Sequence, residues 1–548
     1  MALVNWETVV SRKRKEQAHF ISTFVSAELS DLADHHNDYK AITDIDDIAI
    51  LASKIATGQL TSENVTKAYI SRAIEAHKKT HALSNEANSH KPTSLTEILF
   101  EDALHHAREL DTYQTKEGKT KGPFHGIPIS LKDQFNVKSY DTTLGYTGRA
   151  YNQASEDAVL VTMLKQLGAV IICKTNLPQS IMWSETDNPL WGLTENPIIP
   201  GYNPGGSSGG ESALLYSHGS IVGFGSDLGG SIRMPAHALG LYGFKPSNAR
   251  LPYAGVPVST EGQEHVPSSI GPLARSLSSV YQVMRELTLL EPWTKDCRCV
   301  PIPWRQDVYD STLKHKLTIG VLHDDGVVKP HPTIKRVMDE AAAALAADGH
   351  DLVEWNPELH AECIEVMDLY FIVDGGEDVR RAVAEGGEPY IPHVEKLINK
   401  GKSISIYEYW QLNKRKRALQ QAYLEKWNSI RSTRTGKPVD AILTPAMPHS
   451  AVPHRTNRWV GYTKIWNLLD YTALVIPGGR VEPQDLEAAW DHAPRNEMDE
   501  WNFRLWEDNK HDMTENRLPV DVQLVGKVLE EEKLLAIGKV LDDLLRDK

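Results

Sequence analysis

The sequence has few cysteines, and their spacing does not suit a structural framework. Of Cys173, Cys297, Cys299 and Cys363, only the C-R-C pair is close in sequence. Disulfide-rich domains and structural zinc sites need several cysteines, commonly in doublets such as C-x-x-C. The sequence also lacks H-E-x-x-H, a zinc-protease motif, and G-x-x-x-x-G-K-[ST], a nucleotide-phosphate loop. We therefore expect no disulfide framework, no metal and no cofactor.

Long hydrophobic runs are also missing. No stretch approaches the roughly eighteen uninterrupted apolar residues that indicate a membrane-spanning helix. The opening "MALVNWETVVSRKRKEQ" has neither the apolar core nor the cleavage pattern of a signal peptide. We expect a cytoplasmic protein that does not act at a membrane.

Positive charge is in deficit. The chain has 59 Lys and Arg against 73 Asp and Glu, which gives a formal net charge of −14. This charge repels phosphate backbones and anionic lipid, so nucleic acid and membrane surfaces are not expected as partners. With 41% hydrophobic residues, the composition is that of a globular protein with a sizeable core.

Strand-like apolar runs alternate with helical segments through most of the chain. "AVLVTMLKQLGAVIICKTN" has the pattern of a helix, a glycine stop and a buried strand, and "EEEKLLAIGKVLDDLLRD" that of a terminal helix. Further predicted strands are "LTIGVL", "HDLVEW", "DAILTP", "TALVIP" and "LPVDVQLVG". This alternation predicts an α/β fold, with a large, mixed and mostly parallel central sheet covered on both faces.

Two regions differ from this pattern. Residues 1–80 are polar and helical, and we expect them to form a helical segment that packs on the main domain at 81–548. Residues 480–517 contain Trp490, Trp501 and Trp506 among many acidic residues, and we expect them to form a long surface excursion.

The stretch "NPGGSSGGES" at 203–212 has two ordinary interpretations. Glycine-serine tracts are often flexible linkers, but this one continues directly into core-forming sequence. It also matches G-x-S-x-G around Ser208, the nucleophile elbow of α/β-hydrolases. That motif needs a buried strand before it, whereas prolines at 197, 200 and 204 interrupt the preceding segment.

A third interpretation combines this stretch with "GSDLGGSIRMPA" and "GIPISLKD". Amide hydrolysis needs a nucleophile, a base and hydrogen-bond donors for the developing oxyanion. "DLGGS" offers the backbone amides of Leu228, Gly229, Gly230 and Ser231, with Ser231 as a candidate nucleophile. Lys132 ends an apolar run, where loss of hydration favours its neutral, basic form, although an ordinary surface lysine remains the alternative.

In this order and spacing, the three motifs strongly resemble the amidase signature family of serine hydrolases. Lys132 precedes Ser207 by 75 residues, and Ser207 precedes Ser231 by 24. The resemblance extends from about residue 50 to the terminal helix. It is closest to the fungal acetamidase-like branch, in stretches such as "LPYAGVPVSTEGQEHVPSSIGP" and "NLLDYTALVIP". It implies a single α/β/α domain and allows a homodimer formed through the N-terminal helices.

The resemblance also implies roles for individual residues. Ser231 would be the acyl-enzyme nucleophile, Lys132 the base, and Ser207 the bridging serine on a cis peptide after Gly206. Ser208 would support this network by hydrogen bonding, and Asp227 and Arg233 would brace the loop, although a plain ion pair is an equal alternative. "KTNLPQSIMWSET" would border the acyl pocket, with Ile181, Met182 and Trp183 as its candidate lining or as ordinary core residues.

The sequence therefore predicts an amidase that releases an acid and ammonia or an amine from a small or medium amide. One alternative is an esterase or carbamate hydrolase that uses the same site. A second is a catalytically silent binding protein of this fold, against which the presence of all three candidate residues argues.

Overall fold

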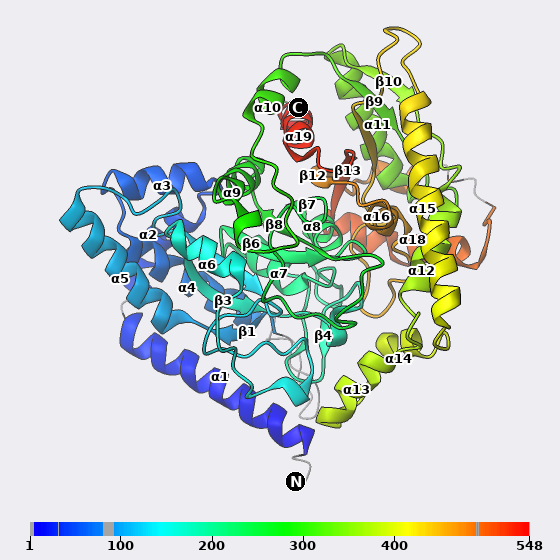
Figure 1. The fold of residues 1–548 in the computed structure, drawn as a ribbon. Helices are drawn as coiled ribbons and strands as arrows, with labels where there is room; N and C mark the ends of the chain where they lie inside the picture. Colours follow the sequence, from blue (N-terminus) through cyan, green and yellow to red (C-terminus); the bar gives the residue numbers. More distant parts are fainter. Residues whose placement is uncertain (1–4, 31, 80–92, 489, 491–492, 547–548) are drawn as a thin grey trace.

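The computed structural model describes residues 5–30, 32–79, 93–488, 490 and 493–546 (Figure 1). In this part of the chain, eleven strands form one sheet in the order β1-β3-β2-β6-β8-β7-β12-β13-β11-β9-β10. The strands are β1 (Leu95–Ile98), β2 (Pro128–Lys132), β3 (Val170–Thr175), β6 (Val222–Asp227), β7 (Tyr242–Lys245), β8 (Ser269–Ala274), β9 (Thr318–Val321), β10 (Asp351–Glu354), β11 (Ala441–Pro445), β12 (Ala473–Arg480) and β13 (Pro519–Val525). The predicted α/β fold with a large mixed sheet is confirmed.

Strand direction varies across this sheet. β3, β2 and β6 run parallel, as do β11, β9 and β10. The remaining neighbours pair antiparallel, including the run from β6 through β8, β7 and β12 to β13. The expectation of mostly parallel strands does not hold in this central region, because β8 is inserted antiparallel between β6 and β7.

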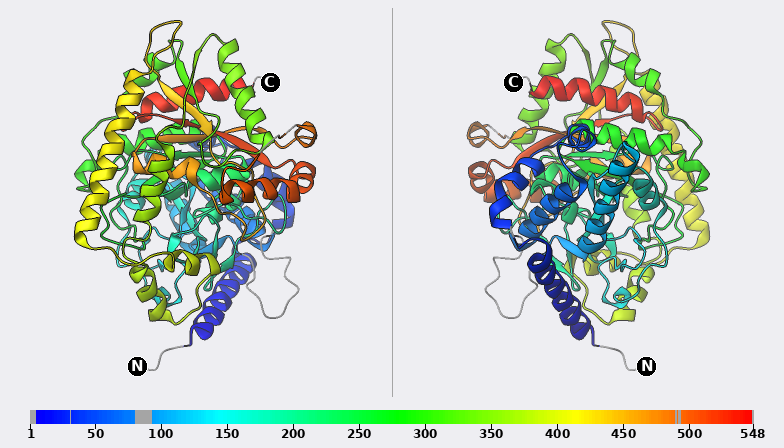
Figure 2. Two further views of the ribbon diagram at one scale, coloured as in Figure 1. Left: turned by 90° about the vertical axis from the view of Figure 1, so that its right-hand side faces the viewer. Right: turned by 90° about the vertical axis from the view of Figure 1, so that its left-hand side faces the viewer.

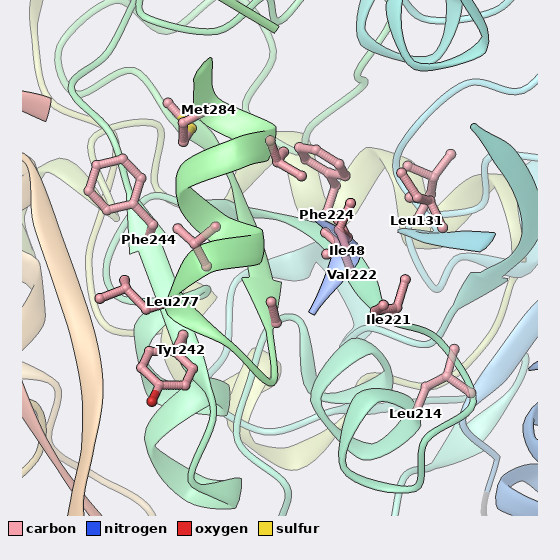
Figure 3. Packing of buried hydrophobic residues seen from close by; sticks show 14 of the residues in the cluster. Ile48, Leu131, Leu214, Ile221, Val222, Phe224, Tyr242, Phe244, Leu277 and Met284 are labelled. Atoms are coloured by element: carbon pink, nitrogen blue, oxygen red, sulfur yellow. The ribbon is translucent and has the colours of Figure 1, made fainter. Parts of the chain in front are cut away.

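Alternating side chains divide the core between the two faces of the sheet. Val222 and Phe224 of β6 belong to the same buried cluster as Leu277 and Met284 of α9 (Leu277–Leu289), and Figure 3 shows these side chains around the helix. The opposite face holds a smaller cluster, built from α7 (Gly209–Tyr216), α8 (Arg233–Leu239) and strand residues such as Val475. Period-two alternation of this kind is what a sheet covered on both faces requires.

The predicted helices lie where their sequence patterns begin and end. The apolar stripe of α5 (Phe100–Glu117) is buried, and the helix ends at Gly118, whose φ of 67° suits glycine. The helices predicted in "AVLVTMLKQLG" and at the C-terminus are α6 (Val159–Gln166) and α19 (Glu531–Arg546), and further helices include α4 (Ser62–Lys79) and α11 (Pro332–Ala347).

The N-terminal helices α1 (Trp6–Glu28), α2 (Leu32–Thr43), α3 (Ile48–Ala56) and α4 gather on one side of the molecule (Figures 1 and 2). Phe24, Leu51 and Tyr69 belong to the same buried cluster as Val222 of β6. The predicted boundary at residues 80 and 81 lies outside the described residues, so the division into segment and domain stays a prediction.

The region 480–517 is less exposed than expected. It contains α17 (Gln484–Glu487) and α18 (Glu497–Glu515), and Leu505, Trp506 and Met513 of α18 join the main core. Trp506 is only 2% exposed. The surface-excursion prediction was wrong for α18. Acidic residues dominate the sequence of this helix, although one of its faces is apolar and buried.

Among the described residues, no helix is both long enough and apolar enough to cross a membrane.

Candidate active site

Two neighbouring parallel strands bring the three motifs together. β2 ends at Lys132 and pairs with β6, which ends at Asp227 just before the loop that carries Ser231. The serine-glycine stretch that precedes α7 contains Ser207 and Ser208. Because parallel strands end at the same edge of a sheet, the base and the candidate nucleophile loop meet there.

Lys132 and Ser207 are in direct contact. Lys132 Nζ lies 2.6 Å from Ser207 Oγ and 3.1 Å from Ser226 Oγ, and the lysine side chain is completely buried. Ser226 Oγ in turn donates to Gln134 Oε1 at 2.5 Å. The amine is therefore held between two hydroxyl groups rather than extended into solvent.

The environment of Lys132 favours its neutral form. Burial lowers its pKa from 10.5 to about 7, and the negative charges of Asp227, Glu211 and Asp133 oppose the change. Asp133 Oδ2 accepts hydrogen bonds from the backbone amides of Thr143 and Leu144, at 2.9 Å each. At neutral pH, a substantial fraction of this amine can therefore accept a proton.

The peptide bond between Gly206 and Ser207 is cis, as expected. A Cβ atom on Gly206 would lie 2.5 Å from the backbone nitrogen of Glu185, so the turn has room only for glycine. The serine-glycine stretch is therefore a packed turn that places Ser207 against Lys132, and the linker interpretation was wrong.

Ser208 is hydrogen-bonded to the Ser231 loop through its backbone. Its backbone amide donates to the carbonyl of Ser231 at 3.2 Å, which ties the two loops together. Its hydroxyl is buried and has no hydrogen-bond partner in the described part of the chain, so the hydrogen bond that Ser208 makes to the Ser231 loop comes from its backbone. Ser208 is fully buried and lines neither cavity described below, which disfavours it as a nucleophile.

A buried ion pair holds the Ser231 loop. Arg233 donates to the two carboxylate oxygens of Asp227 at 3.0 and 2.8 Å, and both side chains are completely buried. Asp227 also accepts from the backbone amides of Gly230 and Ile232, at 2.8 and 3.1 Å. Burial raises the pKa of Asp227, but the Arg233 guanidinium outweighs this and holds it well below its usual range.

The same ion pair is fastened to the C-terminal half of the chain. Arg233 donates to the Thr463 carbonyl, to Gln523 Oε1 and to Asn467 Oδ1, at 2.9, 2.8 and 2.7 Å. Thr463 and Asn467 lie on α16 (Gly461–Leu468), and Gln523 lies on β13. The ion pair of Asp227 and Arg233 therefore connects the loop to α16 and β13, and its supporting role at the site stays a prediction.

Not all of the predicted oxyanion donors are available. The Gly230 amide is committed to Asp227 Oδ1, which removes it from the expected set of four. In the described part of the chain, the amides of Leu228, Gly229 and Ser231 have no hydrogen-bond acceptor. Three backbone donors therefore remain beside the Ser231 hydroxyl.

Glu211 is a buried carboxyl group that the sequence analysis missed. It accepts from Ser130 Oγ at 2.6 Å and from Thr175 Oγ1 at 2.7 Å. Burial raises its pKa to about 7, while the two hydroxyl groups and Lys132 act in the opposite direction. The only sequence signal was its place directly after the glycines, in "GGES".

Two cavities meet at Ser231. The first has a volume of about 470 Å³ and is also lined by Ser207, Ser226 and Tyr253. The second, of about 260 Å³, is also lined by Gly229, Trp183, Phe371 and Trp459. Ile181, Met182, Leu228 and Ser231 line both cavities.

The segment predicted to border the acyl pocket therefore lies at the site. Ile181 and the preceding Ser180 have φ angles of 57° and 68°, left-handed values that are unusual outside glycine and cluster at functional sites. Trp183 lines only the second cavity and stacks on His393, with ring centroids 4.8 Å apart.

Among the described residues, no group of three or more His, Cys, Asp or Glu side chains is placed to hold a metal ion.

Comparisons with known proteins identify relatives along nearly the whole chain. A family model described as Amidase matches residues 64–535. "Amidase 1" of Gibberella moniliformis is 50% identical over 500 residues, which cover 91% of this chain and 93% of that protein. An "Acetamidase" of Emericella nidulans is 39% identical over 502 residues, covering 91% of this chain and 88% of the relative.

A solved structure of similar fold is also found for this chain. A structure named "Fatty acid amide hydrolase" superposes with a TM-score of 0.82 and 29% sequence identity. The match covers 100% of this chain and 91% of the other.

Proposed function

Since the chain belongs to the Amidase family and is an amide hydrolase, we propose that it acts through an acyl-enzyme on Ser231, with Lys132 as the base. The observation that carries this proposal is the 2.6 Å contact between Lys132 Nζ and Ser207 Oγ, beside the cavity that Ser207 and Ser231 share. In the proposed arrangement, Lys132 is the base, Ser207 supplies the bridging hydroxyl, and Ser231 is the nucleophile that contacts the substrate.

In the first step, Ser231 Oγ attacks the amide carbonyl carbon. Its proton passes to Ser207 Oγ, whose own proton passes to the neutral Lys132 amine. The carbonyl oxygen becomes an oxyanion, for which the amides of Leu228, Gly229 and Ser231 are the available donors. Each such donor contributes about 3 kcal/mol of transition-state stabilisation in enzymes where it has been removed.

In the second step, the tetrahedral intermediate collapses. The proton held by Lys132 returns through Ser207 to the amide nitrogen, so that ammonia or an amine leaves as a neutral molecule. A water molecule then repeats the sequence on the acyl-enzyme, which releases the acid and restores Ser231. No charge accumulates over the cycle, because Lys132 gains and returns one proton in each half.

We further propose that the acyl group is small or of medium size. The two cavities have volumes of about 470 and 260 Å³, in the lower part of or below the roughly 300–1,000 Å³ range of small-molecule sites. Relatives named acetamidase support a small acyl group. A series of primary amides with lengthening acyl chains tests this, and the highest kcat/KM for a long-chain fatty amide would overturn it.

Replacement of the nucleophile tests the mechanism. Ser231→Ala should lower kcat by about three orders of magnitude or more, because the acyl-enzyme can no longer form. The variant should unfold at nearly the same urea concentration as the wild type, since Ser231 lies in a loop and packs little apolar surface.

A covalent serine probe distinguishes the rival nucleophile. We expect mass spectrometry to find the label on Ser231 in the wild type and in Ser208→Ala, and no label in Ser231→Ala. Turnover of Ser231→Ala within tenfold of the wild type, or a label on Ser208, would contradict the assignment.

A further inference from the structure

The second cavity carries an excess of positive charge. Its lining includes Lys400, Arg458 and Lys464, against a single carboxylate, that of Asp368. The whole chain has a formal net charge of −14, so the excess of positive charge in this cavity is opposite in sign to the net charge of the chain. This local reversal of charge occurs beside the nucleophile.

Only one of the three cations is neutralised. Lys464 Nζ lies 2.5 Å from Asp368 Oδ1 and 5.3 Å from the centre of the Trp459 ring, and the lysine side chain is 3% exposed. The side chains of Lys400 and Arg458 are exposed at the cavity and have no ion-pair partner in the part of the chain that the structure describes. Two of the residues that line this cavity therefore carry a positive charge that no ion pair in the described part of the chain neutralises.

The first cavity has the opposite sign. Its ionisable lining consists of Glu261, Glu264 and Arg298. An anionic group would be repelled at Glu261 and Glu264 and attracted at Lys400 and Arg458. The two cavities on either side of Ser231 therefore give an anionic amide one preferred orientation.

The second cavity is also apolar near the nucleophile. A Cβ atom on Gly229 would lie 3.3 Å from the ring of Phe371 and 3.9 Å from Cβ of Lys464. Trp183, Met234 and Met498 complete this apolar part of the wall. A substrate group there would cross an aromatic and thioether surface before it reaches the charged rim.

We propose that the second cavity selects amides bearing a carboxylate on the half of the molecule that enters it, separated from the amide by a short apolar or aromatic spacer. Monoamides of dicarboxylic acids and acylated aminobenzoates have this chemistry. The inference rests on the proposed hydrolysis at Ser231, and adds to it the charge and orientation of the substrate.

Matched substrates test the proposal. On the acyl side, the monoanilide of succinic acid is compared with 4-methylpentananilide, in which an isopropyl group replaces the carboxylate. On the amine side, N-butyryl-4-aminobenzoate is compared with N-butyryl-4-isopropylaniline. We expect a higher kcat/KM for the anion in one pair, which identifies the half that enters the second cavity, and a smaller preference at high ionic strength.

Paired charge variants show whether the cavity causes the preference. Lys400→Gln/Arg458→Gln should reduce the anion-to-neutral ratio of kcat/KM by about fivefold. This is the effect expected when the substrate carboxylate loses two solvent-exposed ion pairs of typical strength. Lys396→Gln/Lys402→Gln removes two exposed charges nearby that do not line the cavity, and should leave the ratio unchanged.

The possible failures are distinguishable. An equal rate for both members of each pair, or an equal loss in both double variants, would overturn the proposed selectivity while hydrolysis at Ser231 still stood. No turnover of any neutral or anionic amide, together with no probe label on Ser231, would overturn the proposed function itself.

Discussion

At the scale of single residues, the proposed mechanism depends on how Lys132 loses its charge. Its amine is fully buried between Ser207 and Ser226, and burial lowers its pKa to about 7. An ordinary lysine with a pKa near 10.4 would be almost entirely protonated at neutral pH and unable to act as a base. The neutral, active form therefore predominates above about pH 7 and is lost as the pH falls.

Glu211 should tune this ionisation. Glu211 is negatively charged above its own pKa of about 7, and in that form it favours the Lys132 ammonium and so raises the pKa of Lys132. Glu211→Gln removes that charge, and we expect the acid limb of the kcat/KM profile to move to lower pH. Glu425→Gln, on the exposed face of α15 (Ile406–Ser429), is the control and should leave the profile in place. An unchanged or alkaline-shifted limb in Glu211→Gln would contradict the assignment of that limb to Lys132.

Sequence reasoning identified Lys132, Ser207 and Ser231 because each lies in a recognisable local motif. It missed Glu211 and Ser226, whose roles depend on which strands are neighbours. The two hydroxyl groups that donate to Glu211 come from β2 and β3. Ser226 reaches the Lys132 amine because its strand, β6, pairs with β2. It also assigned an oxyanion role to Gly230, because the commitment of that amide to Asp227 is visible only in three dimensions.

At the scale of elements, the loop between β6 and α8 fixes the nucleophile. Gly230 has a φ of 128°, and a Cβ atom there would lie 2.3 Å from Thr463 Oγ1 on α16. The loop can therefore approach α16 closely only if this residue is glycine. The ion pair of Asp227 and Arg233 then holds both ends of the same loop.

Gly230→Ala should displace Ser231. We expect kcat/KM to fall by about 100-fold, since small misplacements of reacting groups have costs of that order. The free energy of unfolding should fall by about 1–3 kcal/mol. Gly58→Ala is the matched control, because its φ is 72° and no atom lies within 4 Å of the added Cβ. Full activity in Gly230→Ala would show that the loop does not set the position of Ser231.

Most elements were predictable, but their pairing was less so. Helices such as α5 and α19 and strands such as β3 and β13 follow local periodicity and length. The antiparallel centre of the sheet was not anticipated, because local patterns do not say that β8 lies between β6 and β7. The buried face of α18 was missed since its acidic residues dominate the composition of that segment.

At the scale of the whole molecule, the N-terminal helices are part of the structure around the site. Lys13 of α1 forms ion pairs with Glu97 at 2.8 Å and Asp141 at 2.7 Å, and the Asp141 side chain is only 1% exposed. Arg14 donates to the carbonyls of Leu190 and Pro189, at 2.8 and 3.1 Å. These polar contacts join the helix to the main sheet and to the loop that follows Trp183. A cytoplasmic location and a homodimer stay predictions.

Lys13→Met should therefore destabilise the whole molecule. It removes the ion-pair partner of the buried Asp141 carboxylate, and we expect a loss of about 2 kcal/mol in one cooperative urea transition. Lys15→Met changes an exposed neighbour on the same helix and should have little effect. Circular dichroism and tryptophan fluorescence should give coincident curves. A separate early transition confined to the N-terminal helices would mean that they form an independent unit.

The most direct test of the central claim is the rate of Ser231 acylation as a function of pH in the wild type, Lys132→Ala and Lys132→Arg. A single-turnover experiment with an amide substrate, with the acyl-enzyme trapped by acid, isolates this step. In the wild type the rate should fall about tenfold per pH unit below about pH 7, as a single protonation requires. Both variants should acylate at least about a thousandfold more slowly, because alanine has no base and a guanidinium cannot give up its proton in this range. Near-wild-type acylation by Lys132→Arg would contradict the account, since the positive charge alone would then suffice and the base would lie elsewhere.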